Sequence, residues 1–209
     1  MIYSPWLNLA CDTPTYVSEA FREIREVHEL EASCGLSAHR LGSALHRAGD
    51  IAFTQLPAAN SASFRANGAA YAGPRRSVYD EVANPLYASR EVLQRVPPIQ
   101  IHTAISEVLS AESAILATKL AAVGGAAELH LYDGMWHDFP MYYGGCDAGH
   151  NGSLLFAHVA LNRTAAFLQH VGAHGVAPFA QTGAPTTLLH YEYPEGHDSA
   201  SIIAYHAVD

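Results

Sequence analysis

The chain has 209 residues, of which 49% are hydrophobic and 15% are charged, and its net charge is −9. This length suits one domain of ordinary size, and the hydrophobic fraction allows a buried core and excludes wholesale disorder. Nucleic acid is a poor partner for such an acidic chain, because phosphate binding needs clustered lysine and arginine. The sequence has neither an apolar run that could span a membrane nor a signal peptide, so the default expectation is a cytoplasmic protein.

The three cysteines and thirteen histidines form no recognisable metal or disulfide pattern. Cys11, Cys34 and Cys146 contain no Cys-x-x-Cys pair and are too few for a disulfide framework. No His-Glu-x-x-His occurs, and His150 and His158 are eight residues apart with a glycine between them. We therefore expect no metal and no cofactor, while a histidine-based metal-binding protein stays open as one alternative.

The N-terminal part of the chain predicts a short strand, a helix and an irregular segment. Residues 2–9 begin as a strand, and a strand that starts at the initiator methionine suggests that preceding sequence is absent. A helix is predicted over 15–33, where apolar residues recur every three or four positions after Thr13-Pro14. Residues 49–76 are rich in Ala, Ser, Asn, Gly and Pro, which predicts an insertion or loop with little regular structure.

Strands and helices then alternate. A strand is predicted at 99–104, a helix at 111–123, a second strand at 128–132 and a long helix at 153–171. This order is typical of a parallel sheet that is covered by helices. The tail, 172–209, consists of a linker and two strand-like runs about a turn, which predict a β-hairpin to which we attach no function.

Two polar residues follow the predicted strands directly. Glu107 comes after the strand that ends near Ala104, and His137 comes after the strand that ends at Tyr132. Functional groups gather at the carboxyl ends of parallel strands, and sequential strands of this kind usually lie side by side. A carboxylate that accepts the Nδ1 hydrogen of an imidazole fixes its tautomer and stabilises the imidazolium. Glu107 and His137 therefore make two-thirds of a catalytic triad.

Several motifs support this interpretation by their order and spacing. They are Tyr3-Ser4-Pro5-Trp6-Leu7-Asn8-Leu9, Asn84-Pro85-Leu86-Tyr87-Ala88, Pro97-Pro98-Ile99-Gln100-Ile101-His102, Glu107-Val108-Leu109, and Leu131 to Phe139, which contains Gly134-Met135-Trp136-His137-Asp138-Phe139. Together they resemble the C-terminal half of the hormone-sensitive-lipase-like esterases, the α/β-hydrolase fold-3 family. The resemblance covers residues 1–171.

The resemblance implies the C-terminal portion of an α/β-hydrolase fold, with about three parallel strands and flanking helices. Residues 1–171 would form this partial domain, with a cap-like helix and insertion at about 15–80, and 172–209 would be an extension. By the same resemblance Glu107 is the triad acid and His137 the general base. Trp136 and Phe139 either line an acyl pocket or pack the loop, and Asp138 is interpreted as a loop residue.

The chain departs from the family where the nucleophile is concerned. It contains neither the Gly-x-Ser-x-Gly elbow nor the His-Gly-Gly-Gly loop that supplies oxyanion donors. The nearest serine context is that of Ser37, which ends in His39 where the elbow needs a small residue, and which follows a predicted helix rather than a strand. The family is one of serine esterases and lipases, but we expect this isolated chain to be inactive.

Two further hypotheses therefore stand beside metal binding. In the first, the chain is part of a carboxylic-ester hydrolase, from a truncated gene model or a longer product, and acts on a small ester once the missing half completes it. In the second, it is a degenerate, non-catalytic paralogue that serves as a binding or regulatory module. In either case the strand at Ile2-Tyr3 would be an open apolar edge, prone to self-association.

Overall fold

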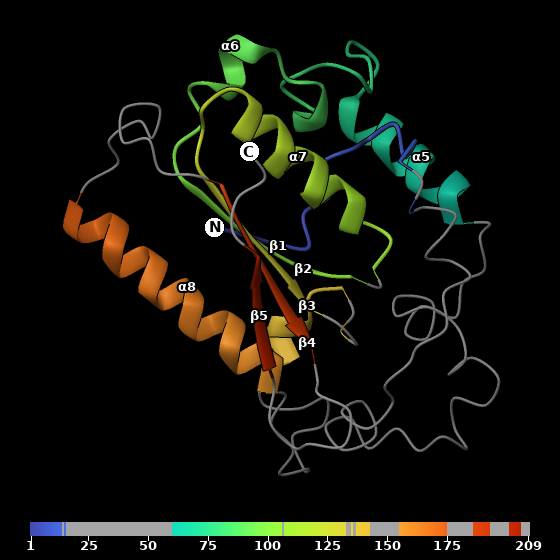
Figure 1. Ribbon diagram of the computed structural model, residues 1–209. Coiled ribbons are helices and arrows are strands. Elements are labelled where there is room, and N and C mark those ends of the chain that lie inside the picture. Colours follow the sequence, from blue (N-terminus) through green and yellow to red (C-terminus); the bar gives the residue numbers. More distant parts are fainter. Residues whose placement is uncertain are drawn as a thin grey trace, which may run out of the picture.

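A five-stranded sheet, in the order β1-β2-β3-β4-β5, forms the centre of the computed structural model (Figure 1). The structure describes residues 1–13, 15, 60–105, 107–132, 135, 137–142, 155–174, 186–192 and 201–205. The strands are β1 (Ile2–Tyr3), β2 (Ile99–Ala104), β3 (Ala127–Tyr132), β4 (Thr187–Glu192) and β5 (Ser201–Tyr205). β1 to β4 run parallel, and β5 pairs antiparallel with β4.

The two strands predicted at 99–104 and 128–132 are confirmed as β2 and β3, which begin at Ile99 and Ala127. The expected fold of parallel strands with flanking helices is confirmed, with four parallel strands where about three were expected, because β4 adds one. Leu188 in β4 pairs with Leu129 in β3, which lies 59 residues earlier in the chain. A low-complexity linker lies between the two strands, so no local sequence pattern predicts this pairing. β4 and β5 pair within the tail where the sequence predicts a hairpin.

Helices lie on both faces of the sheet (Figure 1). They are α5 (Asn60–Ala72), η3 (Pro85–Tyr87), α6 (Arg90–Leu93), α7 (Ser110–Ala122), η4 (Phe139–Tyr142) and α8 (Leu155–His174). α7 and α8 confirm the helices predicted at 111–123 and 153–171. Gly124, with a φ of 75°, directly follows the last turn of α7, in the left-handed region that suits glycine.

Helices α7 and α8 cover opposite faces of the sheet with apolar side chains. α7 packs Leu116 and Leu120 into one core with Ile101 and Leu129 of the central strands. α8 packs Phe156 and neighbouring alanines into a second core with aromatic residues of β3 and β4. Burial of both faces is what a parallel sheet requires.

The prediction of an irregular segment at 49–76 is wrong for residues 60–72, which form helix α5. Its alanines favour a helix, but its apolar residues follow no helical period, and the glycine and serines suggested a loop. Contacts with the N-terminal segment support it: the ring of Phe64 lies 5.8 Å from that of Trp6. The helix predicted at 15–33 lies outside the described residues, apart from Thr15.

Gly68 lets α5 approach the N-terminal segment. A Cβ at this position would lie 2.3 Å from the carbonyl oxygen of Leu9, so Gly68→Ala should lower the free energy of unfolding by about 1–2 kcal/mol. Gly172→Ala on α8 is the matched control, because its Cβ would meet nothing within 4 Å and alanine favours a helix by up to about 1 kcal/mol. Urea denaturation measures both. A Gly68→Ala protein as stable as the wild type would contradict the close packing of α5.

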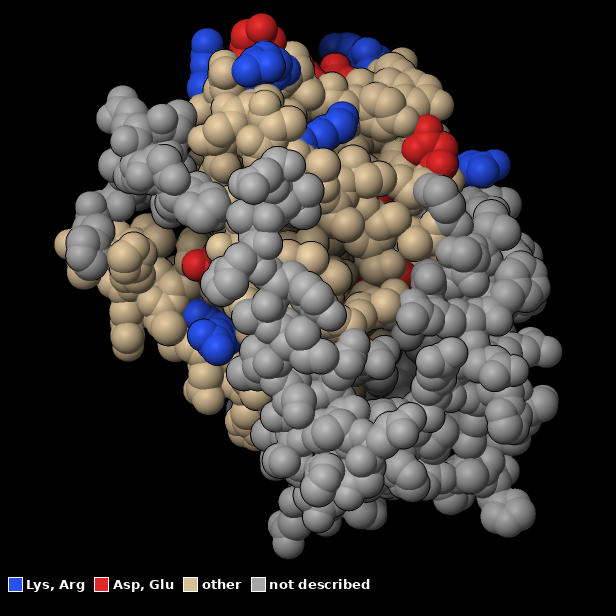
Figure 2. Space-filling model, in the orientation of Figure 1, with Lys and Arg blue, Asp and Glu red and all other residues tan. Residues whose placement is uncertain are grey.

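On the face shown in Figure 2, blue and red side chains of the described part are mixed along the upper edge and form no patch of one sign. Within the described ranges, no helix is both long and apolar enough to cross a membrane. In the same ranges β1 has a partner strand on one side, β2. Self-association through β1 stays a prediction.

Candidate active site

Glu107 lies in the turn after β2 and is completely buried. Its backbone N–H donates to the carbonyl of Ala104 at 3.4 Å, which closes the turn at the end of the strand. Thr103, the penultimate residue of β2, donates its hydroxyl to Oε1 of Glu107. The carboxylate is thus oriented by the strand that precedes it, and its second oxygen, Oε2, points to the neighbouring loop.

His137 lies in that neighbouring loop, which follows β3. Its Nδ1 is 3.4 Å from Oε2 of Glu107. β2 and β3 pair as far as Ala104 and Tyr132, so their following loops leave the sheet side by side. The imidazole is 44% exposed, whereas the carboxylate is 0% exposed. The structure therefore brings together the two residues that the sequence singles out, with Glu107 on the inside and His137 facing outward.

Asp138 occupies the other side of the imidazole. Its Oδ2 lies 3.3 Å from Nε2 of His137. Asp138 has a φ of 55°, in the left-handed region that non-glycine residues rarely adopt. Its backbone N–H donates to Oγ of Ser4 at 3.0 Å, which supports this backbone conformation. The interpretation of Asp138 as a plain loop residue therefore overlooks its contact with the histidine.

Ser4 is the anchor of this loop, and the sequence carried no signal for that role beyond a Ser-Pro turn after a strand. It is 3% exposed, and its backbone N–H donates to the carbonyl of His102 at 2.8 Å. This bond continues the pairing of β1 with β2. The loop of His137 is thus tied to the end of β1 as well as to the end of β3.

The two residues expected to contact substrate have different positions. Phe139 is completely buried, and its ring lies 4.8 Å from that of Tyr132, in the core that includes Met135 and Phe156. This is the loop-packing role; a substrate contact of Phe139 stays a prediction. Trp136 lies outside the described residues, as does Ser37.

Glu112, in the first turn of α7, is a second buried carboxylate that sequence reasoning missed. Its Oε2 accepts the backbone N–H groups of Leu7 at 2.5 Å and Asn8 at 2.9 Å. It thereby holds the segment after β1 against α7, close to the turn that carries Ser4. An acidic residue at a helix N-terminus was the available signal, since the helix dipole favours negative charge there.

Glu112→Gln should lower the free energy of unfolding by about 1–2 kcal/mol, because two charge-assisted hydrogen bonds become neutral ones. Glu91→Gln is the matched control, since Glu91 is an exposed glutamate in the first turn of α6. Chemical denaturation at pH 7 compares the two variants. Equal stability of both variants and the wild type would show that the negative charge of Glu112 adds nothing to these bonds.

No group of three or more His, Cys, Asp and Glu side chains is placed to hold a metal ion in the part of the chain that the structure describes. The Glu107–His137 arrangement contains groups that can transfer a proton. With a carboxylate behind Nδ1, Nε2 would be the nitrogen to exchange a proton with a substrate or nucleophile.

The comparison with protein families agrees with this fold. The family described as the alpha/beta hydrolase fold matches residues 37–141, a span that includes both Glu107 and His137. The match covers half of the chain, and the chain therefore belongs to this family. The resemblance to the fold-3 group that the motifs indicate is thereby confirmed. Comparisons with curated proteins and with solved structures gave no match.

Proposed function

We propose that Glu107 and His137 are the acid–base half of a carboxylic-ester hydrolase. The observation that carries the proposal is the 3.4 Å approach of His137 Nδ1 to the fully buried Glu107 carboxylate. In such a site Nε2 of the histidine takes the proton of a serine hydroxyl, and the serine oxygen attacks the ester carbonyl. The imidazolium, stabilised by the carboxylate, then gives its proton to the leaving alcohol. Water releases the acid from the acyl-serine by the same route.

These 209 residues contain no Gly-x-Ser-x-Gly, the motif that usually carries the nucleophilic serine. We propose that the serine and the oxyanion donors come from a segment outside these residues. The completed protein would act on a small ester, and Trp136 and Phe139 would limit the size of its acyl group. Without that segment both covalent catalysis and oxyanion stabilisation are lost.

Two measurements test this proposal. The transcript 5′ of Met1 should encode an in-frame Gly-x-Ser-x-Gly, and a transcript that begins cleanly at Met1 would count against it. The purified 209-residue chain should take up no fluorophosphonate, and it should hydrolyse p-nitrophenyl butyrate no faster than its His137→Ala variant. Hydrolysis by the chain that depends on His137 would show instead that a nucleophile lies within these residues.

The second candidate is a non-catalytic binding or regulatory module. It is favoured by the contact of His137 Nε2 with Asp138 Oδ2 at 3.3 Å, because this is the nitrogen that a serine hydroxyl has to reach. An extended protein that contains the elbow serine, yet shows neither fluorophosphonate labelling nor ester hydrolysis, would favour this alternative. Labelling that is lost when His137 is replaced would favour the hydrolase.

A further inference from the structure

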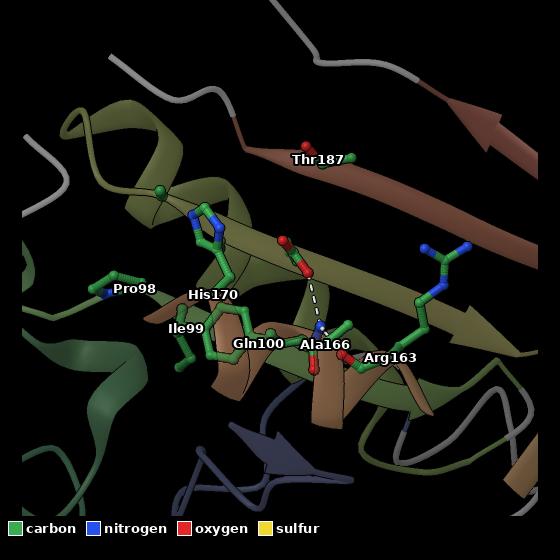
Figure 3. A pocket seen from close by; sticks show the side chains of 11 residues that line it. Pro98, Ile99, Gln100, Arg163, Ala166, His170 and Thr187 are labelled. Carbon is green, nitrogen blue, oxygen red and sulfur yellow. Dashed lines mark hydrogen bonds between the residues drawn. The ribbon is translucent and has the colours of Figure 1, made fainter. Parts of the chain in front are cut away.

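A cavity of about 370 Å³ lies at the amino ends of β2, β3 and β4, beside α8 (Figure 3). It is at the opposite end of the strands from Glu107 and His137, and neither residue lines it. Its polar lining consists of Gln100, Glu128, Arg163, His170 and Thr187. The proposed ester hydrolysis uses none of these groups.

The first feature of the cavity is a row of hydrogen bonds from the core to Glu128. Gln100 is 1% exposed; its Nε2 donates to Oε2 of Glu128 at 2.7 Å, and its Oε1 lies 2.9 Å from Nε2 of His102. Since an amide oxygen only accepts, Nε2 of His102 carries the proton. Burial lowers the pKa of His102 to about 2, so the ring is neutral. Its Nδ1 therefore accepts from the hydroxyl of Tyr132 at 2.9 Å.

A second row of hydrogen bonds reaches the same oxygen from β4. Nε2 of His130 lies 3.4 Å from Oε2 of Glu128, and Nδ1 lies 2.9 Å from the hydroxyl of Tyr191. A carboxylate accepts, so Nε2 of His130 donates to Glu128, while its Nδ1 is hydrogen-bonded to the tyrosine hydroxyl. The hydrogen bond from His130 lowers the pKa of Glu128 and outweighs the opposing effect of burial. Glu128 is thus ionised at neutral pH.

Both rows end in an N–H group that donates to the same carboxylate oxygen. Hydrogen bonds in such chains polarise one another and so stabilise a negative charge at the end of the chain. Both rows end on Oε2, so Oε1 is the oxygen that a ligand can use, as far as the described residues show. The Glu128 side chain is 44% exposed at the cavity. The Glu128 carboxylate is thus stabilised by two rows of hydrogen bonds, which a glutamate at the surface does not need.

The guanidinium of Arg163 brings a positive charge to the same cavity from α8. Arg163 and His170 lie on either side of Gln100 in the view of Figure 3. Among the described side chains no ion pair within 4.0 Å links Arg163 to Glu128. The charge of Arg163 nevertheless helps to lower the pKa of Glu128, and its side chain is hydrogen-bonded to the hydroxyl of Tyr191. Ile99 and Phe167 supply apolar lining. The cavity therefore combines a fixed anion, a cation and an apolar wall.

We propose that this cavity binds a small zwitterion, an α-amino acid with an apolar side chain. Its ammonium group would contact Oε1 of Glu128, its carboxylate would contact the guanidinium of Arg163, and its side chain would pack on Ile99 and Phe167. Glu128 and Arg163 form no ion pair with each other, so one small molecule that carries both a positive and a negative charge can contact both side chains. The site is separate from the proposed hydrolase site.

Titration with three compounds tests the proposal on the purified chain by NMR and calorimetry. The probes are L-phenylalanine, 2-phenylethylamine, which lacks the carboxylate, and 3-phenylpropionate, which lacks the ammonium group. L-Phenylalanine should bind at least about tenfold more tightly than either analogue, since each lost charge removes a charge-assisted hydrogen bond. Its binding should shift the amide signals of Gln100 and Phe167.

Two variants assign the charges. Glu128→Gln should weaken L-phenylalanine about tenfold and leave 3-phenylpropionate unchanged, whereas Arg163→Gln should weaken L-phenylalanine and leave 2-phenylethylamine unchanged. Arg163 is exposed on α8, so this variant keeps the test valid even where Glu128→Gln disturbs folding. Arg95→Gln, at an exposed arginine outside the cavity, is the control and should bind as the wild type does. Absence of binding, or equal binding of the three compounds, would overturn the proposal.

Discussion

In a protein that joins these residues to an elbow serine, His137→Ala should lower kcat for p-nitrophenyl butyrate by about 10⁴- to 10⁶-fold. The proposed mechanism gives the imidazole both proton transfers, from the serine and to the leaving alcohol. Stopped-flow or plate-based release of p-nitrophenol measures the effect. KM should change little, because His137 acts on protons that move in the transition state rather than on bound ester.

Glu107→Gln should lower kcat in the same protein by about 10³- to 10⁴-fold. An amide at this position no longer stabilises the imidazolium, and it can hold the ring in the wrong tautomer. Because the two residues act as a unit, the double variant should be no slower than His137→Ala alone. His158→Gln, at an exposed histidine of α8, is the control. A loss of less than tenfold in His137→Ala would remove the histidine from the mechanism.

Acid should destabilise the fold through His102, by about 2.7 kcal/mol between pH 8 and pH 4.5. Burial is the main cause that lowers the pKa of His102 from 6.5 to about 2, with a smaller effect of the nearby His130. The unfolded chain takes up a proton below pH 6.5 and the folded chain does not, so stability falls as the pH falls. Each pH unit below 6.5 costs about 1.4 kcal/mol until the folded ring itself titrates.

Urea denaturation at several pH values between 8 and 4.5 measures this loss. His102→Gln should lower stability at every pH. Below pH 6.5 its stability should fall less steeply with falling pH, because unfolding of this variant takes up one proton fewer than unfolding of the wild type. His158→Gln, at the exposed position on α8, should keep the wild-type slope. The same slope in His102→Gln as in the wild type would show that the buried ring takes up a proton without unfolding.

Local patterns were enough for the central elements. Apolar residues at helical spacing predict α7 and α8, and short β-branched or alternating runs predict β2 and β3. Glu107 and His137 are predictable because each lies in the loop that follows one of these strands, and sequential parallel strands usually lie side by side. The structure confirms the elements and brings the two side chains together at 3.4 Å.

α5 and β4 needed the tertiary structure. α5 has no apolar stripe and is supported by Leu9 and Trp6, more than fifty residues earlier in the chain. β4 is positioned by its pairing with β3, from which a long linker separates it in the sequence. Contacts of this kind are invisible to a local pattern because propensity is weak and distant packing overrides it.

The sequence by itself therefore determined the family, the order of the central elements and the proximity of Glu107 and His137, since each depends on neighbours in the chain. Only the tertiary structure decided what surrounds that pair, namely Asp138 on Nε2 and Ser4 beneath the loop. It alone also aligned Gln100 with Glu128 and His102 with His130. The register of β2 against β3 creates the network at the second cavity, and a shift by one residue would send these side chains to opposite faces.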